Sequence, residues 1–210
     1  MAPLLYKLDA SPPACAVRMV ADIIGLQLDF KDPDISTLEH KSSKYLQVSC
    51  LSCLHAIMIY LLSVYGGDKS ESLYPSDVRT RAIVNQIMFF DTGILFIRIK
   101  VVALPTIMEG MKSPTEKHLH DLEVAYAMVE AYLSRHKYIA AEHLTIADLS
   151  VATTLGAAEA ILPLNKDKFP LTANWQAVML ELPSFKKIAT PGIAKFNLVM
   201  RHYWEKNNQQ

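Results

Sequence analysis

A serine in a predicted turn at the start of a helix is the best candidate for chemistry in this sequence. Ser11 follows Asp9 and Ala10 and precedes two prolines, and apolar residues at helical spacing begin just after it. The unpaired N–H groups of a helix start, together with the helix dipole, favour an anion beside such a hydroxyl. Ser11 therefore either caps this helix or donates a hydrogen bond to a bound anion, and the residues alone leave both alternatives open.

Cysteines are the second group of candidates. Cys15 lies at the start of the same predicted helix, where a thiol pKa can be lowered, although we favour a packed and unreactive thiol. Cys50 and Cys53 have the C-x-x-C spacing of a redox motif. A zinc site would find only His40 and His55 nearby and no second cysteine pair. We therefore predict no metal, and favour two small apolar residues over a redox pair.

Two short strands and a helix must position Ser11. Residues 4–8 are apolar and end in the Ser-Pro-Pro turn, and residues 14–24 have helical apolar spacing that Gly25 closes. Residues 26–30 alternate apolar and polar side chains, which predicts a half-buried strand. Strand, helix and strand within about thirty residues predict one right-handed βαβ unit.

Helical patterns dominate the rest of the chain. An apolar stretch over residues 54–65 ends at a Gly-Gly-Asp sequence, and Tyr74 and Pro75 mark a linker. Beyond it, prolines separate five predicted helices, over residues 78–103, 115–135, 146–162, 171–182 and 184–189. The sequence thus predicts an α/β N-terminal domain over residues 1–70 and an all-α helical domain over residues 77–210.

The helix predicted at residue 146 starts with a capping box. Thr145 and Asp148 have the spacing at which the hydroxyl accepts the N–H of the third helical residue and the acid bonds the N–H of the cap. The residues that follow are almost all apolar or small, which predicts a helix buried on every side. We interpret this feature as a folding signal and not as a reactive group.

The composition is that of a globular protein with a substantial core. The chain has 210 residues with 21 basic and 21 acidic side chains, and this balance argues against a nucleic acid or an anionic membrane as partner. The apolar runs over residues 53–64 and 93–105 are shorter than the roughly 20 residues that a membrane span needs. Three cysteines and a start without a basic segment predict a cytoplasmic protein.

Four motifs resemble the cytosolic glutathione transferase superfamily, and above all its insect delta and epsilon classes. In the order of that family they are Tyr6–Pro13 (YKLDASPP), His55–Leu61 (HAIMIYL), Ser72–Pro75 (SLYP) and Leu144–Asp148 (LTIAD). The resemblance implies a thioredoxin-like N-terminal domain that binds glutathione as a co-substrate. It also implies an all-α C-terminal domain with a pocket for small hydrophobic electrophiles, and a homodimer.

The resemblance also implies roles for single residues. Ser11 would be catalytic and glutathione-binding, because its hydroxyl would donate a hydrogen bond to the glutathione sulfur and stabilise the thiolate. His40 matches a family histidine near the glycine end of glutathione, and Lys100 could pair with the glutathione carboxylate. The residues that would line the electrophile pocket share one face of a long helix and its exit: Phe96, Ile99, Lys100, Ala103, Leu104 and Met108. Core packing is the alternative and suits Phe89 well, and Asp91 belongs either to a subunit interface or to a buried network.

The N-terminal domain departs from the family pattern in one place. Roughly a dozen residues, about the length of two strands, are absent between Ser49 and the helix at His55. In the family that segment carries a cis-proline, beside which the backbone pairs with the cysteinyl part of glutathione. The acid and serine that usually hold the γ-glutamyl group fall on Cys53 and Leu54. We therefore predict a truncated sheet and a glutathione site that lacks these parts.

Three functions compete. The one we favour is conjugation of glutathione to apolar electrophiles, with thiol and electrophile held together by the protein. The second is a non-catalytic ligand binder on the same fold, with an impaired glutathione site. The third is a thiol redox protein that uses Cys15 or the pair Cys50 and Cys53.

Overall fold

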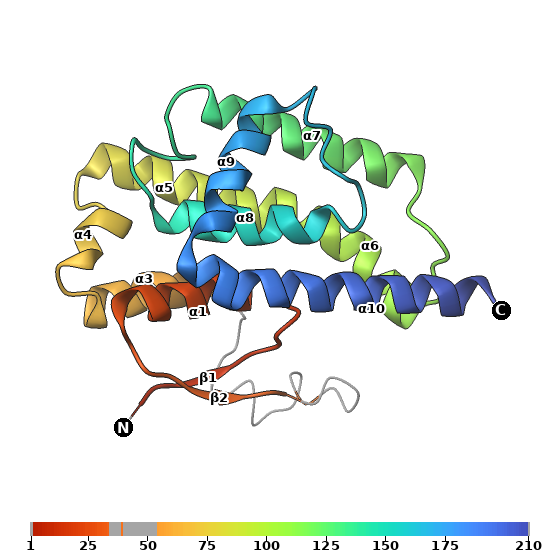
Figure 1. Ribbon diagram of the computed structural model, residues 1–210, viewed down its shortest axis with the longest axis horizontal. Helices are drawn as coiled ribbons and strands as arrows, with labels where there is room; N and C mark the ends of the chain where they lie inside the picture. Colours follow the sequence, from red (N-terminus) through yellow and green to blue (C-terminus); the bar gives the residue numbers. More distant parts are fainter. Residues whose placement is uncertain (1, 34–38, 40–53, 210) are drawn as a thin grey trace.

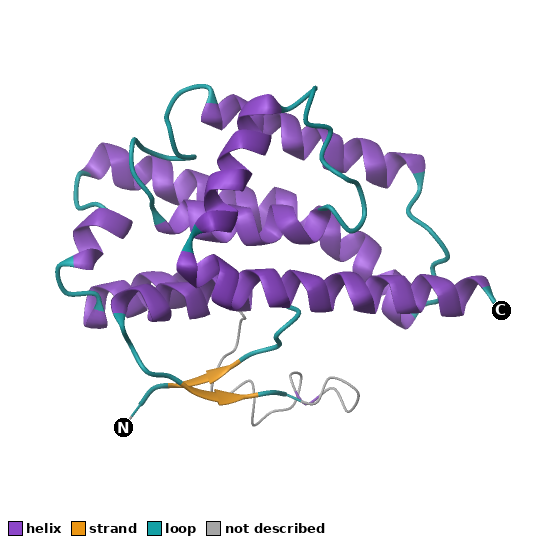
Figure 2. Cartoon of the chain, viewed as in Figure 1, coloured by secondary structure: helices purple, strands orange, loops and turns teal. Residues whose placement is uncertain are grey.

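The computed structural model describes residues 2–33, 39 and 54–209. Figure 1 shows a body of helices with two short strands along one side of it. Figure 2, coloured by secondary structure, shows that helices make up nearly all of that body. The predictions for His40, Cys50 and Cys53 fall on residues outside the described ranges.

The predicted βαβ unit is confirmed. Strands β1 (Leu4–Tyr6) and β2 (Asp29–Lys31) pair in parallel, with Leu5 opposite Phe30, and helix α1 (Pro12–Ile24) connects them. Gly25 ends α1 in the left-handed region at φ 75°, where its N–H donates to the carbonyl of Asp22. Within the described residues the sheet has these two strands, in agreement with the predicted truncated sheet.

The second strand is not half-buried as predicted. All three residues of β2 are exposed, and the Phe30 ring is 51% exposed, with Lys7 and Arg18 placed against it. The apolar Leu26 and Leu28 instead pack against the core from the connection between α1 and β2. The N–H of Leu26 donates to the carbonyl of Ala21, so this connection begins as a continuation of the end of α1. The alternating pattern therefore marked the connection and not the strand.

Helix α1 leads from the strands into the helical body. Its residues Ala16, Val17, Met19 and Val20 are fully buried. It packs against α3 (Leu54–Tyr65) on one side and α8 (Ile146–Ala158) on the other. After α3, the short helix α4 (Lys69–Leu73) leads to Tyr74 and Pro75. The core thus runs without interruption from α1 into the helices that follow.

One long helical rod follows the predicted linker. It consists of α5 (Val78–Phe90), the π-helical turn η2 (Asp91–Leu95) and α6 (Phe96–Met108). The rod runs five residues beyond the predicted end at residue 103, because Pro105 lies inside α6 and does not end it. A proline removes one N–H and strains the helix, but here only a few residues follow it before the helix ends.

Helix α8 is the centre of the helical body. All 13 of its residues are buried, and the capping box of Thr145 and Asp148 is present at its start, which confirms both predictions. It ends at Ala158 and not at residue 162, since the next residues turn back onto the carbonyl of Ala158. Helices α7 (Glu116–Leu133) and α9 (Pro170–Glu181) pack against each other, and α9 also contacts α8.

The C-terminal helix was missed by the sequence analysis. The turn η3 (Phe185–Ala189) continues into α10 (Thr190–Asn208), which runs along the whole helical body in Figure 1. The prediction stopped at residue 189 because Pro191 was interpreted as a helix end. In the structure Pro191 is the second residue of α10, directly after η3, and a proline is tolerated in the first turn of a helix.

Candidate functional site

The turn between β1 and α1 presents Ser11 at the start of α1. The N–H of Ser11 donates to the carbonyl of Leu8 at 3.0 Å, and the N–H of Cys15 donates to the carbonyl of Ser11 at 3.0 Å. Pro12 and Pro13, the first two helical residues, have no N–H. Among the described residues the half-buried Ser11 side chain makes no cap hydrogen bond. Its hydroxyl therefore stands at the positive end of the helix dipole, able to donate to an anion.

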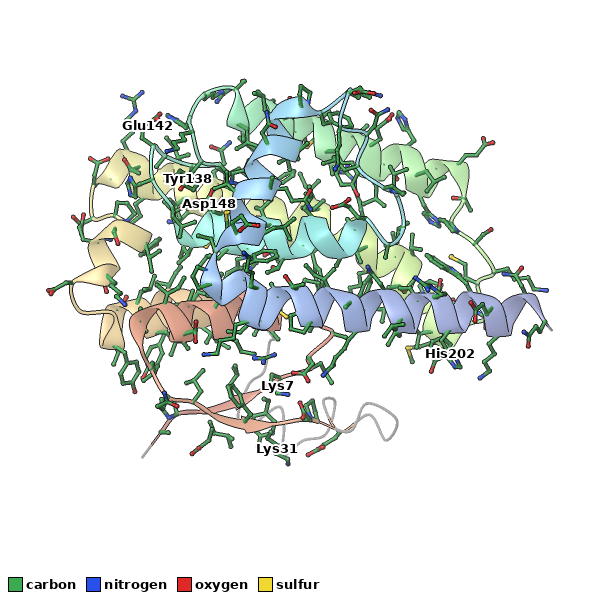
Figure 3. All side chains as sticks on the ribbon, in the orientation of Figure 1. Lys7, Lys31, Tyr138, Glu142, Asp148 and His202 are labelled. Atoms are coloured by element: carbon green, nitrogen blue, oxygen red, sulfur yellow. The ribbon has the colours of Figure 1, made fainter. Side chains whose placement is uncertain are left out.

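A cluster of charges holds the same turn two residues earlier. Asp9 accepts hydrogen bonds at Oδ1 from Lys7, the residue after β1, at 2.7 Å and from Arg18 of α1 at 2.9 Å, and at Oδ2 from Lys195 of α10. The hydrogen bonds from Lys195 and Lys7 hold the pKa of Asp9 well below its ordinary value. Burial alone would lower the pKa of Lys7, but its bonds to Asp9 and Asp32 outweigh burial and raise it. Figure 3 shows Lys7 between the strands and the helical body.

Cys15 is a packed thiol, as the sequence analysis favoured. It is 1% exposed, and its Sγ lies 3.4 Å from the carbonyl oxygen of Asp9. Burial raises the pKa of this thiol to about 11, so it is protonated at neutral pH. A protonated, buried sulfur is a poor nucleophile, and these properties do not favour the redox hypothesis at this residue.

A buried polar network joins α3 to the helical rod and α8. His55 Nε2 lies 3.1 Å from Asp91 Oδ2 and 2.7 Å from Ser150 Oγ, and the Ser150 hydroxyl donates to Asp91. Thr92 Oγ1 lies 2.7 Å from His55 Nδ1. The Thr92 hydroxyl also donates to the Met88 carbonyl at 3.1 Å, and which ring nitrogen of His55 donates depends on the tautomer. Of the two roles open to Asp91, the structure places it in the buried network, with none of its surface exposed.

The predicted electrophile-pocket residues separate into a buried and an exposed set. Ile99 and Ala103 are 1% and 7% exposed and face the core, and Phe96 is half-buried. Leu104 and Met108 are 41% and 62% exposed at the end of α6. A face of α6 therefore offers apolar surface at its C-terminal end, while its middle contributes to the core.

Two further predictions concern charged and apolar side chains on the rod. Lys100 is exposed on α6, so its ammonium group is accessible to an anion. The core position predicted for Phe89 is wrong, because this ring is 78% exposed on α5. Val84 and Ile87 are buried on one face of α5, whereas Phe89 lies on an exposed face. Apolar spacing alone did not separate the two faces.

Two surface hollows lie elsewhere on the helical body. One, of about 250 Å³, opens between α7 and α9 beside Trp175, and the other, of about 310 Å³, opens between α8, α9 and α10 beside Ile193. Neither Ser11 nor a predicted pocket residue lines them. In the described part of the chain no cluster of three or more His, Cys, Asp or Glu residues could hold a metal ion, and no helix is both long and apolar enough to cross a membrane.

Sequence reasoning missed several residues of the turn and of the network. Asp9 was visible only as part of the YKLDASPP motif, and no pattern in the sequence connects it to Lys195, 186 residues away. Ser150 is one of four buried polar residues of α8, with Asp148, Thr153 and Thr154, and a polar residue in a helix predicted to be buried on every side is the signal that could have identified a buried hydrogen-bond partner.

Comparison with known proteins agrees with this architecture. The family model described as "Glutathione S-transferase, C-terminal domain" matches residues 57–183. The chain is 32% identical to Glutathione S-transferase 1 of Manduca sexta over 90% of this chain and 92% of that protein.

Solved structures extend the likeness to the N-terminal half. An epsilon-class glutathione S-transferase from the housefly, Musca domestica, has a TM-score of 0.90 at 28% identity, covering 95% of this chain and 97% of that one. A glutathione transferase homologue from Drosophila mojavensis, solved with bound glutathione, has a TM-score of 0.90 at 30% identity, covering 96% and 97% of the two chains.

A short sheet with its connecting helix, joined to an all-helical body, is the architecture of two-part proteins with a thioredoxin-like N-terminal part. The chain belongs to the glutathione S-transferase family, and its relatives among insect enzymes confirm the predicted resemblance. The predicted fold class is confirmed with it: a thioredoxin-like N-terminal part with a short sheet and an all-α C-terminal part.

Proposed function

We propose that this protein conjugates reduced glutathione to small hydrophobic electrophiles, and that the Ser11 hydroxyl stabilises the glutathione thiolate. The observation that carries the proposal is the Ser11 side chain, which makes no cap bond among the described residues at the start of α1. Residues 1–70 would hold glutathione, with Ser11 and His40 among its contacts, and residues 77–210 would hold the electrophile.

The chemistry needs a charged sulfur close to an electrophilic carbon. The glutathione S–H loses its proton to solvent, and a hydrogen bond from Ser11 together with the α1 dipole favours the resulting thiolate. The sulfur then forms a bond to the carbon of the electrophile, and the leaving group departs with its bonding electrons. Holding the two reactants in contact removes most of the entropy cost of a bimolecular step.

The apolar end of α6 supports the choice of hydrophobic electrophiles. Leu104 and Met108 are exposed there, Phe96 is half-buried at the start of the same helix, and Ile99 and Ala103 are buried in the core. Apolar and aromatic surface of this kind binds flat apolar compounds and excludes water. Lys100, exposed on the same helix, would attract the carboxylate of glutathione or a polarised group of the substrate.

Two exposed apolar side chains on α5 support the predicted homodimer. Val78 and Phe89 are 82% and 78% exposed and stand eleven residues apart, so they share one face of α5. Large exposed apolar side chains on one face mark an interaction surface, and a second copy of the chain would cover them symmetrically. Light scattering of wild type and of Phe89→Ser tests this, since a wild-type monomer would reject the dimer.

The cytoplasm is the compartment that this function requires. Reduced glutathione and free thiols persist there, and the odd number of three cysteines in the chain suits such a reducing compartment.

Glutathione titration and one substitution test the proposal. Wild type should bind glutathione saturably and conjugate it to chlorodinitrobenzene. Ser11→Ala should lower kcat/KM about 10- to 100-fold, the value of a hydrogen bond to a charged group, without changing the unfolding midpoint. Binding of an apolar dye without binding of glutathione would favour the non-catalytic binder instead. Activity that disappears only when cysteines are replaced would favour the redox alternative.

A further inference from the structure

The backbone just before Ser11 is held by three cations, two of which come from helices. The Asp9 carboxylate pairs with Lys7, the residue after β1, with Arg18 of α1 and with Lys195 of α10. The lysine at position 195 is the only one of the three donors that comes from the C-terminal half of the chain. Through it, a helix 186 residues away contacts the turn that carries the candidate catalytic hydroxyl.

The main chain of Asp9 meets α10 as well. A Cβ added at Gly192 would lie 2.6 Å from the Asp9 carbonyl oxygen and 2.5 Å from Cys15 Sγ, so only glycine allows this approach. The Cys15 thiol donates to that same carbonyl oxygen at 3.4 Å. Both the carboxylate and the carbonyl of Asp9 are therefore fixed from outside the turn.

The turn itself offers little restraint of its own. Among the described residues the hydrogen bond of the Ser11 N–H to the Leu8 carbonyl closes it, and Ala10 and Ser11 are only half-buried. The direction of the Ser11 hydroxyl relative to α1 thus depends on where Asp9 is held. An exchange of partners at Asp9 would move Ser11, because a single residue separates the two.

We propose that Asp9 and Lys195 are positioning residues that fix the Ser11 hydroxyl against the glutathione sulfur, so that α10 controls the reactivity of the thiol site. This inference rests on the proposed function of Ser11. Asp9 and Lys195 act through Ser11 and do not touch the reacting atoms. The pair makes the C-terminal helix part of the machinery that ionises glutathione.

A second lysine supplies a matched control. Lys187 of η3 donates to Asp22, which lies near the far end of α1, and it is 70% exposed against 56% for Lys195. Each lysine therefore forms a surface ion pair between the C-terminal half and the N-terminal part of the chain. Lys187 pairs with α1 itself, whereas Lys195 pairs with the turn that carries Ser11. The variants to compare are Lys195→Met, Lys195→Arg and Lys187→Met in the full chain.

The first measurement is the pKa of enzyme-bound glutathione, followed by the ultraviolet absorbance of the thiolate, with the pH profile of kcat/KM for chlorodinitrobenzene. Lys195→Met should raise the pKa of the bound thiol. At pH values below that pKa, it should lower kcat/KM about two- to five-fold, the range that measured surface ion pairs give. Lys195→Arg should restore wild-type values because it keeps the cation. Lys187→Met should match wild type in both readouts.

The second measurement needs no glutathione. Hydrogen exchange of the peptide covering residues 7–16 should be faster in Lys195→Met than in wild type or Lys187→Met. Unchanged exchange would overturn the inference, as would faster exchange with an unchanged thiol pKa, since the pair would then be structural only. A wild type that binds no glutathione would overturn the proposed function, and this inference with it, whatever the exchange result.

Discussion

Helices α1 and α8 both begin at a hydroxyl residue, and they treat it in opposite ways. At α8, Asp148 Oδ2 accepts the Thr145 N–H at 2.8 Å and the Thr145 hydroxyl at 2.9 Å. Its Oδ1 accepts the Ile139 N–H at 2.8 Å and the Trp175 indole N–H at 3.0 Å. Every polar atom of the Asp148 carboxylate is thus bonded, although the residue is completely buried.

The start of α1 has none of these partners in its own first turn. Two prolines follow Ser11, no acidic residue lies in the first turn, and no side-chain cap bond forms among the described residues. Charges on other elements hold the turn instead, through Asp9. A helix start closed by its own side chains serves folding, whereas one held open from outside leaves a hydroxyl and a dipole for a ligand.

The largest expected effect comes from breaking the closed cap. Asp148→Ala would leave the N–H groups of Ile139, Thr145 and Trp175 buried without acceptors, and should lower the free energy of unfolding by about 3 kcal/mol or more. Urea unfolding monitored by circular dichroism measures it. The exposed pair of Asp121 and Lys117 supplies the control, since Asp121→Ala should leave the unfolding midpoint near that of wild type. A small effect of Asp148→Ala would remove the distinction between the two helix starts.

Ser11→Asp sharpens the comparison from the other side. Aspartate is as good an N-cap as serine, so the stability of the fold should be unchanged or slightly higher. Its negative charge would repel a thiolate and remove the donor, and kcat/KM should fall about 100-fold. Steady-state kinetics and thermal unfolding on the same preparation measure both. Loss of stability together with activity would mean that Ser11 serves folding, as Thr145 does.

Gly192→Ala tests whether the open turn is held from α10. The added methyl group would overlap the Asp9 carbonyl and Cys15 Sγ, and should lower the free energy of unfolding by about 1–3 kcal/mol, the usual cost of overpacking. Gly93→Ala is the matched control, because nothing lies within 4 Å of its added Cβ. The double variant with Cys15→Ala should recover only part of the loss, since the carbonyl overlap persists.

Acid should weaken the open turn only below about pH 4. The pKa of Asp9 is lowered in the folded chain, so its ion pairs contribute fully above its ordinary value of 3.8 and are lost as pH falls further towards the folded value. Urea unfolding of wild type and Asp9→Asn at a series of pH values measures this. The difference in stability between them should be constant near neutral pH and shrink below about pH 4. A difference that grows on acidification would contradict the sign.

Much of the fold could be predicted because local signals agreed with tertiary structure. The helix end at Gly25, the capping box at Thr145 and the buried helix α8 were each predicted from a pattern with a single physical explanation. The structure contains all three. Two of the errors in helix boundaries occur where proline has two meanings. Pro105 lies inside α6, and Pro191 lies at the start of α10, although both were interpreted as helix ends.

The candidate site was predictable only in its local part. Ser11 and its helix start are adjacent in sequence, so motif and capping rules identify them. The partners of Asp9 and His55 come from elements up to 186 residues away, and one-dimensional spacing carries no information about such contacts. The exposed Phe89 was assigned to the core because periodicity identifies an apolar position without showing which side of a helix a partner will cover.

The bond between His55 and Asp91 has a consequence for how the molecule can be divided. A fragment beginning at residue 77 would keep the Asp91 carboxylate buried while losing the imidazole that bonds it, and would expose the face of α8 that α1 covers. The two halves therefore are not exchangeable modules. Heating the intact chain should give one heat-absorption peak, with both halves melting together.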